Sequence, residues 1–161
     1  MAMDTKPPVK HPAKFSDGMV NVFNRMLFEH LELLSNEELF TILDCFAGVG
    51  GIHELAKLNR KIVGVELEPE WASQHPNNIV GNALSLPFGR DTFWAIITSP
   101  VYGNRMSDKY MGDGTYRATY PIYLGRPVSE TSSAQLQWSQ AYRNFHMAAW
   151  KEAQRVLKPG G

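Results

Sequence analysis

Two apolar runs in this chain each end in a segment suited to ligand binding. Residues 93–97 read Phe-Trp-Ala-Ile-Ile and lead into residues 98–102, Thr-Ser-Pro-Val-Tyr. Residues 41–46 lead into residues 47–51, which hold three glycines. Open α/β sheets bind their ligands beyond the carboxyl ends of neighbouring strands. The sequence therefore predicts such a sheet, with a ligand site at that edge.

Helical and extended segments alternate along the chain. This alternation favours parallel strands joined by right-handed crossovers. A length of 161 residues with 43% hydrophobic content suffices for one domain with its own core, so we expect a single α/β domain over residues 1–161. Strands are expected at 41–46, 61–66, 78–82 and 93–98, and helices at 16–34, 52–58, 70–74 and 139–156, with Ser16 and Ser139 as N-caps.

The charge balance and the cysteine count exclude several classes of protein. Sixteen basic residues balance sixteen acidic ones, so contact with nucleic acid has to come from a local patch. Cys45 is the only cysteine, which excludes an internal disulfide and is typical of a cytoplasmic protein. Its thiol is either reactive or, as we expect, packed at a strand end. We expect no membrane span and no metal site, because the amino terminus lacks an apolar core and the histidines lack ligand spacing.

Residues 103–138 differ in composition from the rest of the chain. Glycine, serine, threonine, tyrosine and arginine dominate, and no helix or strand period persists. A stretch of this length is longer than an ordinary connection, so we expect a long polar loop that is either functional or disordered. Its tyrosines interleave with arginine and lysine, a mixture that suits base stacking and phosphate contact. A flexible loop that is merely rich in tyrosine has the same composition.

The glycine-rich turn and Glu66 point to a cofactor that carries a ribose. Gly48 and Gly50 let the backbone approach a ligand closely at the end of the first strand. The dinucleotide fingerprint has a third glycine where this chain has His53, which argues against a nicotinamide cofactor. Glu66 ends the next strand about twenty residues on, where an acid holds ribose hydroxyls. A solvated carboxylate at a strand end is the alternative.

From residue 14 to residue 161 the chain resembles the amino-methyltransferases of nucleic acids. Residues 44–50 resemble the first motif of this family, which wraps the methionine part of S-adenosylmethionine, and Glu66 matches its ribose-binding acid. Residues 81–88 resemble the third motif, with Asn82 in place of the acid that meets the adenine amino group. Residues 11–15 are similar to an amino-terminal segment of N4-cytosine methylases, whose phenylalanine lies against the methionine part; a hydrophobic staple to the first helix is the alternative. The resemblance implies S-adenosylmethionine as the cofactor, bound by Lys14, Phe15, Asp44, Phe46, Gly48, Gly50, Glu66 and Asn82.

Residues 99–102 resemble the catalytic tetrad of the family, Ser/Asp/Asn-Pro-Pro-Tyr/Phe. The resemblance implies that Ser99 Oγ and the Pro100 carbonyl accept the two hydrogens of the substrate amine, and that Tyr102 stacks on a flipped base. Serine in first place is commonest among N4-cytosine enzymes, so we expect methyl transfer to N4 of cytosine in DNA. An N6-adenine or RNA methyltransferase and a cofactor-binding fragment without catalysis are the alternatives. Val101 stands where the family has a second proline. Valine leaves φ free and restores an N–H, so the Pro100 carbonyl is less preorganised.

The resemblance also implies an incomplete domain. Residues 158–161, Lys-Pro-Gly-Gly, resemble the turn before the fifth strand of the family, so we expect a partial Rossmann-like sheet of order 3-2-1-4 with helices on both faces. The fourth strand then forms an apolar edge without a protecting charge or proline. We expect self-association through this edge, or a missing carboxyl-terminal half. A phage or restriction-modification context and a cytoplasmic location belong to the same expectation.

Overall fold

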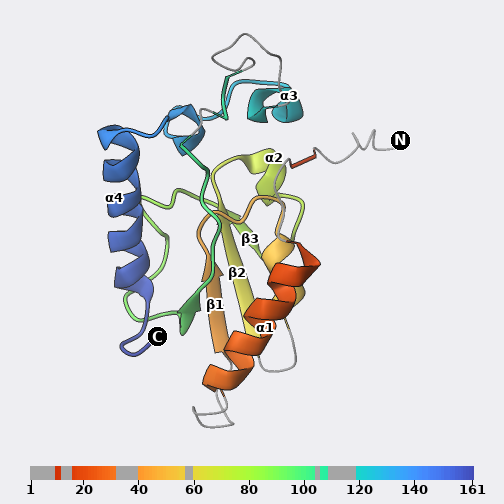
Figure 1. Ribbon diagram of the computed structural model, residues 1–161, viewed down its shortest axis with the longest axis vertical. Helices are drawn as coiled ribbons and strands as arrows, with labels where there is room; N and C mark the ends of the chain where they lie inside the picture. The colour runs from red at the N-terminus through yellow and green to blue at the C-terminus, as the bar shows by residue number, and fades with distance from the viewer. Residues whose placement is uncertain (1–9, 12–15, 32–39, 57–59, 104–105, 109–118) are drawn as a thin grey trace.

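Four parallel strands form one sheet in the computed structural model, which describes residues 10–11, 16–31, 40–56, 60–103, 106–108 and 119–161. β1 (Phe40–Asp44) lies between β2 (Arg60–Glu66) and β4 (Ala95–Ile96), and β3 (Asn78–Val80) pairs with the other side of β2. The order β3-β2-β1-β4 confirms the predicted order (Figure 1). Because the strands are parallel, their carboxyl ends meet at one edge of the sheet.

Helices cover both faces of this sheet, as predicted. α1 (Asp17–Leu31) and the 3-10 helix η1 (Gly51–Leu55) lie on one face, and α4 (Gln140–Val156) lies on the other (Figure 1). Neighbouring residues of a strand point to opposite faces, so Ile42 packs with α1 and η1 while Leu43 packs with α4. Both side chains are fully buried, and each stabilises the fold by about 1.5–3 kcal/mol through its removal from water.

Serine N-caps start the two long helices at the predicted positions. Ser16 Oγ accepts the Met19 N–H at 3.3 Å, and Ser139 Oγ accepts the Tyr142 N–H at 3.3 Å. α1 is described as far as Leu31, and the continuation predicted beyond it lies outside the described residues. None of the described helices has the length and apolar character needed to cross a membrane.

The predicted fourth strand, 93–98, is shortened to β4 by a competing contact. Phe93 donates its N–H to the Val156 carbonyl at 2.9 Å, and its own carbonyl accepts the Lys158 N–H at 2.8 Å. The chain that leaves α4 therefore takes the first residue of the predicted strand away from β1. Trp94 and Ile97 still donate to carbonyls of β1, so backbone contact with β1 extends on both sides of β4.

Three other predicted elements are shorter than expected. β3 ends at Val80, because Asn82 Oδ1 accepts the Leu84 N–H and turns the chain. Where the sequence predicts a helix at 52–58 the structure has η1, with residues 57 and 58 outside the described residues, and the helix predicted at 70–74 is the single turn α2 (Pro69–Ala72). Pro69 is the first residue of α2, a position at which the N–H that proline lacks would have no partner within the helix.

The described part of residues 103–138, where the sequence predicts a long polar loop that is functional or disordered, has short helices of its own. It contains α3 (Tyr120–Leu124) and the 3-10 helix η2 (Ser133–Gln135). Its apolar side chains form a third core cluster with Trp71 of α2, apart from the two clusters that cover the sheet. This part of the sequence shows no helix or strand period, because its apolar side chains converge on one short helix and not on a sheet. We call residues 119–136 the cover segment.

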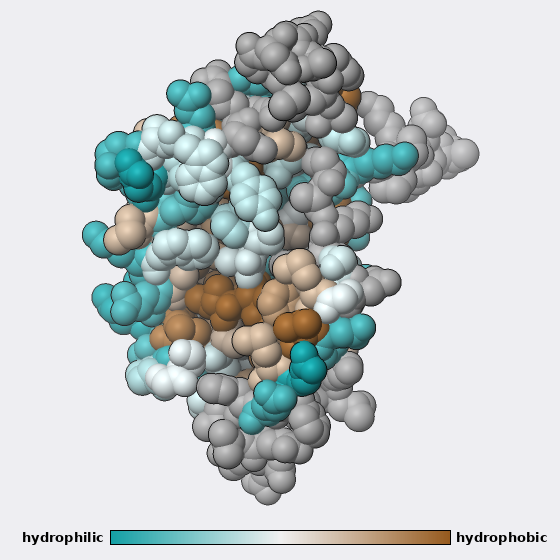
Figure 2. All heavy atoms as spheres, in the orientation of Figure 1, coloured by the Kyte–Doolittle hydropathy of each residue, from teal (hydrophilic) through white to brown (hydrophobic). Residues whose placement is uncertain are grey.

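β4 lies at an edge of the sheet, as predicted, and an apolar groove runs beside it. Figure 2 shows hydrophobic side chains gathered on this face of the molecule, over β4 and α1. Self-association through this edge, or pairing with a further segment, stays a prediction. The apolar side chains that line the groove include Phe23, Met26, Leu27, Phe40, Ile96 and Ile97.

Candidate functional site

A pocket lies where the chain leaves the carboxyl ends of the four strands. Its walls come from the glycine-rich turn after β1, the end of β2, the residues after β3, the residues after β4 and the cover segment. Asp44 and Gly50 are not among the lining residues, and Lys14 and Phe15 lie outside the described residues. The predicted site residues that line the pocket are Phe46, Gly48, Glu66, Asn82, Ser99, Pro100 and Tyr102.

The turn after β1 requires glycine at two positions. Gly48 and Gly50 have positive φ angles of 53° and 87°, a region that other residues rarely adopt. Space is limited as well, since a Cβ on Gly48 would lie 3.1 Å from the His11 ring, and one on Gly50 would lie 2.8 Å from the Cβ of His75. The turn thus presents bare backbone to the pocket, with the His11 imidazole next to it.

Glu66, the last residue of β2, holds this turn with its carboxylate. Oε2 accepts the Gly48 N–H at 2.8 Å, and Oε1 accepts the Glu68 N–H at 2.8 Å. Burial raises the pKa of the Glu66 carboxyl to about 7. The charges of Glu68 and Asp44 raise this pKa as well, whereas the two N–H donors lower it. The group therefore titrates near neutral pH in the wall of the pocket.

Asp44 supports the turn from behind the pocket. Its Oδ1 accepts the Phe46 N–H at 3.0 Å and the Thr98 hydroxyl at 2.6 Å, which ties the end of β1 to the chain leaving β4. Burial raises the pKa of Asp44 to about 6 against the lowering effect of these two donors. Its Oδ2 is buried and has no hydrogen-bond partner in the described part of the chain. Direct contact between Asp44 and a cofactor stays a prediction.

Asn82 links the wall after β3 to the cover segment. Its Oδ1 accepts the Leu84 N–H at 2.9 Å, and its Nδ2 donates to Thr131 Oγ1 at 3.3 Å. An amide oxygen has two lone pairs, so Oδ1 can accept a second hydrogen bond from a ligand. The predicted contact with an adenine amino group therefore stays a prediction that this geometry allows.

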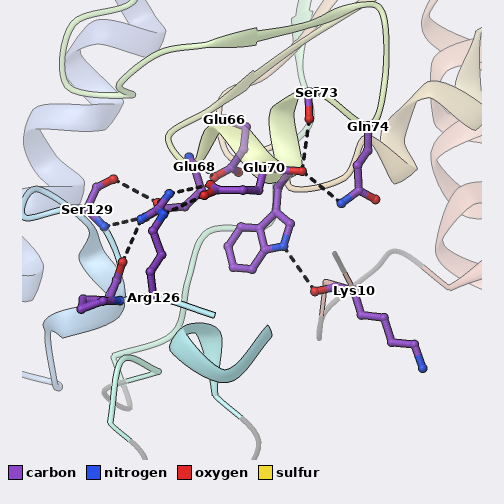
Figure 3. A network of polar contacts seen from close by, with 10 residues as sticks. Lys10, Glu66, Glu68, Glu70, Ser73, Gln74, Arg126 and Ser129 are labelled. Carbon is purple, nitrogen blue, oxygen red and sulfur yellow. Dashed lines mark hydrogen bonds and ion pairs between the residues drawn. The ribbon is translucent and has the colours of Figure 1, made fainter. Parts of the chain in front are cut away.

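A network of acidic residues and one arginine attaches the cover segment to α2 (Figure 3). The Glu68 carboxylate accepts the Ser129 N–H at 2.8 Å and the Ser129 hydroxyl at 3.0 Å, and lies 2.8 Å from Arg126 Nη2. Arg126 also binds both carboxylate oxygens of Glu70, at 2.7 and 2.6 Å. The hydrogen bonds from Arg126 hold the pKa of Glu70 below its usual value. Since the Glu68 N–H binds Glu66, the network runs from the cover segment to the pocket wall.

Residues 99–102 line the pocket after β4. Ser99 is exposed and Pro100 is half-buried, and no described residue forms a hydrogen bond with Ser99 Oγ or with the Pro100 carbonyl. Val101 packs against the cluster of the cover segment, while the Tyr102 side chain is 66% exposed. The Ser99 hydroxyl and the Pro100 carbonyl, which have no hydrogen-bond partner among the described residues, are thus followed closely in the chain by the exposed ring of Tyr102.

Several lining residues are absent from the sequence prediction. His11 lies edge-on to Trp71 with ring centroids 4.4 Å apart, and the Trp71 ring lies 5.0 Å from that of Tyr120. His11 belongs to a segment that the family resemblance contains, so that signal could have found it. Trp71 and Tyr120 carry no such signal, because only tertiary packing brings them together. Met106, Ser132, Ser133 and Phe145 also line the pocket.

Cys45 is a packed residue, as expected. Its side chain is buried, and burial together with the charge of Asp44 raises the pKa of its thiol to about 12. Such a thiol carries almost no reactive thiolate near neutral pH. Among the described residues, no three His, Cys, Asp or Glu side chains are arranged to hold a metal ion.

A solved structure shares this fold over most of the chain. The YcgJ protein from Bacillus subtilis matches with a TM-score of 0.51 and 17% identity, over 91% of this chain and 48% of that one. The chain has a Rossmann-like methyltransferase fold. A putative S-adenosyl-L-methionine-dependent methyltransferase from Methanococcus maripaludis matches with a TM-score of 0.45 and 12% identity, over 94% of this chain and 64% of that one.

A methyltransferase is also similar in sequence over part of the chain. The 23S rRNA (uracil(1939)-C(5))-methyltransferase RlmD from Shewanella sp. (strain ANA-3) is 36% identical over 75 residues, which are 46% of this chain. The matched part spans 17% of the length of that relative. No protein-family model matches the chain.

Proposed function

We propose that this chain transfers a methyl group from S-adenosylmethionine to an exocyclic amino group of a nucleobase, with N4 of cytosine in DNA as the first candidate. The observation that carries the proposal is a single pocket, lined by Gly48 and Glu66 and also by Ser99 and Pro100. A cofactor held by the first pair would lie next to a substrate held by the second. Direct transfer between two bound molecules requires this proximity.

The residues present fit S-adenosylmethionine. The bare backbone at Gly48 allows the methionine part to approach closely, and the Glu66 carboxylate can accept hydrogen bonds from ribose hydroxyls. Asn82 offers an amide for the adenine amino group. When bound, this cofactor supplies an electrophilic methyl group on a positively charged sulfur.

Residues 99 and 100 supply what an amine substrate needs. The lone pair of an exocyclic amine is delocalised into its ring, which makes the nitrogen a poor nucleophile. Ser99 Oγ and the Pro100 carbonyl, by accepting the two amine hydrogens, would draw the nitrogen toward a tetrahedral shape and aim its lone pair out of the ring plane. Both acceptors are uncommitted among the described residues.

Exposed aromatic side chains near these acceptors support a nucleobase as the substrate. Tyr102 and Trp138 both have exposed rings. The Trp138 N–H donates to the Gly103 carbonyl at 2.7 Å, which brings Trp138 close to the residue that follows Tyr102. Exposed aromatic rings stack on unpaired or flipped bases in proteins that bind nucleic acids.

An RNA base is the second candidate, because the partial sequence relative is named for its action on 23S rRNA. That name places the methyl group on carbon 5 of uracil, a chemistry that this chain fits less well. Carbon 5 becomes nucleophilic when a thiolate adds to the ring, whereas Cys45, the only cysteine of the sequence, is buried with a raised pKa. Transfer to an amino group of cytosine or adenine needs no thiolate.

Methyl transfer from tritium-labelled S-adenosylmethionine tests the proposal. The protein is incubated with DNA that contains cytosine, with DNA that lacks it and with RNA of the first sequence, and the modified nucleosides are identified by mass spectrometry. We expect N4-methylcytosine in the cytosine-containing DNA. N6-methyladenine or a methylated ribonucleoside would favour the alternatives. A protein that binds the cofactor but methylates none of these substrates would be a binding fragment without catalysis.

Binding of S-adenosylmethionine is expected to strengthen as the pH rises from 6 to 8. The carboxylate form of Glu66 accepts ribose hydroxyls better than the protonated form, which has lost its charge and one acceptor site. With its pKa at about 7, Glu66 is about one-tenth ionised at pH 6 and about nine-tenths ionised at pH 8, so the affinity should rise about tenfold. Isothermal titration calorimetry across this range measures the change.

Glu66→Gln is the control for this measurement, because an amide does not titrate. The pH dependence that remains in the variant belongs to the cofactor and to other groups. Circular dichroism first establishes that the variant folds, since Glu66 also accepts the N–H groups of Gly48 and Glu68. The same pH dependence in both proteins would remove Glu66 from the cofactor site.

A further inference from the structure

Tyr142 of α4 and Trp138, just before that helix, hold residues 101–103 by two hydrogen bonds. Tyr142 Oη donates to the Val101 carbonyl at 2.9 Å, and the Trp138 N–H donates to the Gly103 carbonyl at 2.7 Å. Tyr142 as a whole is 7% exposed and its bond to the Val101 carbonyl is partly buried, so the bond forms in surroundings that are partly shielded from water. A hydrogen bond in such surroundings is electrostatically stronger than one in water.

Packing also restrains Val101 and Gly103 from other sides. The Val101 side chain contacts the cluster of the cover segment. Gly103 has no room for a side chain, since a Cβ there would lie 2.9 Å from the Trp138 nitrogen and 3.1 Å from the Tyr142 ring. Tyr142 is held in turn by the rings of Trp138 and His146, whose centroids lie 4.7 and 4.3 Å from its own.

We propose that Tyr142 is a positioning residue, whose phenol orients the peptide groups next to the Pro100 carbonyl in place of the missing second proline. A proline at position 101 would set φ at about −65°. Valine leaves φ free, so the direction of the Pro100 carbonyl depends on how Val101 is held at its other end. The Tyr142 bond and the packed valine side chain provide that restraint. The inference rests on the proposed function of Ser99 and Pro100 as acceptors.

Tyr142→Phe tests this role because it removes the hydroxyl and keeps the ring. We expect kcat for methyl transfer to fall about five- to tenfold, the factor for one lost hydrogen bond, while KM for S-adenosylmethionine stays within about twofold.

Val101→Pro added to this variant should restore most of the lost rate, since proline fixes φ directly. The same proline in the parent should raise the rate by a smaller factor than it does in Tyr142→Phe, so the two substitutions form a double-mutant cycle. Tyr123→Phe is the control for loss of a phenol hydroxyl, because Tyr123 packs in the cluster that Val101 contacts and has no described hydrogen bond to residues 99–102.

Hydrogen exchange in residues 98–103, followed by mass spectrometry, reports the same restraint without any substrate. We expect faster exchange in Tyr142→Phe and a return toward the parental rate in the double variant. If the parent transfers no methyl group, the proposed function fails, and hydrogen exchange alone decides the role of Tyr142. The inference is overturned if Tyr142→Phe matches the parent in exchange, or if an active parent loses no rate on this substitution. A double variant as slow as Tyr142→Phe would also overturn it.

Discussion

Ser99→Ala is expected to lower the rate of methyl transfer on the order of a hundredfold while the affinity for S-adenosylmethionine stays unchanged. The hydroxyl is one of two acceptors for the hydrogens of the substrate amine. Removal of one oriented hydrogen-bonding group from a reacting centre costs roughly 10²–10³ in rate. No described residue binds Ser99 Oγ, so the substitution should leave the fold intact. Single-turnover transfer at saturating cofactor measures the chemical step.

Ser132→Ala is the matched control for this substitution. Ser132 lines the same pocket but lies on the cover segment, where its Oγ accepts the Ala134 N–H at 3.3 Å. Its transfer rate at saturating cofactor is expected to stay close to that of the parent. Parental transfer by Ser99→Ala would remove Ser99 from the catalytic group, and loss of cofactor binding in that variant would instead place Ser99 in the cofactor site.

Arg126→Gln is expected to lower the free energy of unfolding by about 2 kcal/mol. The Glu68 side chain is 2% exposed and loses its cationic partner when the guanidinium is removed. Loss of one partner from a fully buried ion pair costs roughly 3–5 kcal/mol. The cost is smaller here because Arg126 is 35% exposed and Ser129 still donates two hydrogen bonds to Glu68. Urea unfolding measures the change, which is large against a usual domain stability of about 5–15 kcal/mol.

Two further variants separate the buried contact of Arg126 from its exposed one. Glu70→Gln removes the partner that is 34% exposed and should cost less than about 1 kcal/mol. Glu68→Gln added to Arg126→Gln should recover part of the lost stability, because the buried charge is gone. If Arg126→Gln and Glu70→Gln lower the free energy of unfolding equally, the contact of Arg126 with buried Glu68 contributes no more to stability than its contact with Glu70.

Much of the sheet and of its ligand-binding edge could be predicted from the sequence, because each feature depends on neighbouring residues. Apolar runs predict the strands, and serines before helical periods predict the starts of α1 and α4. Gly48 and Glu66 were placed at strand ends by the same reasoning, and both line the pocket. The strand order and the two covered faces followed from the family resemblance and are confirmed.

The extent of β4 and the structure of the cover segment could not be predicted in this way. Phe93 belongs to an apolar run but forms backbone hydrogen bonds with Val156 and Lys158, at the other end of the chain. Tyr120 and Val128 follow no helix or strand period, because they pack on Trp71 of a short helix. Local patterns report on regular elements, and these contacts are not regular.

The sequence by itself determined the sheet and the chemistry offered at its ligand-binding edge, while the tertiary structure decided how that edge is supported and covered. From the sequence, Val101 indicates a less rigid turn, and only the fold places Tyr142, 41 positions later, on its carbonyl. Arg126 meets Glu68 across 58 positions in the same manner. Such pairs are brought together by the crossovers of the sheet and by the packing of helices against it. The pattern of residues within one segment carries no record of which distant segment will pack beside it.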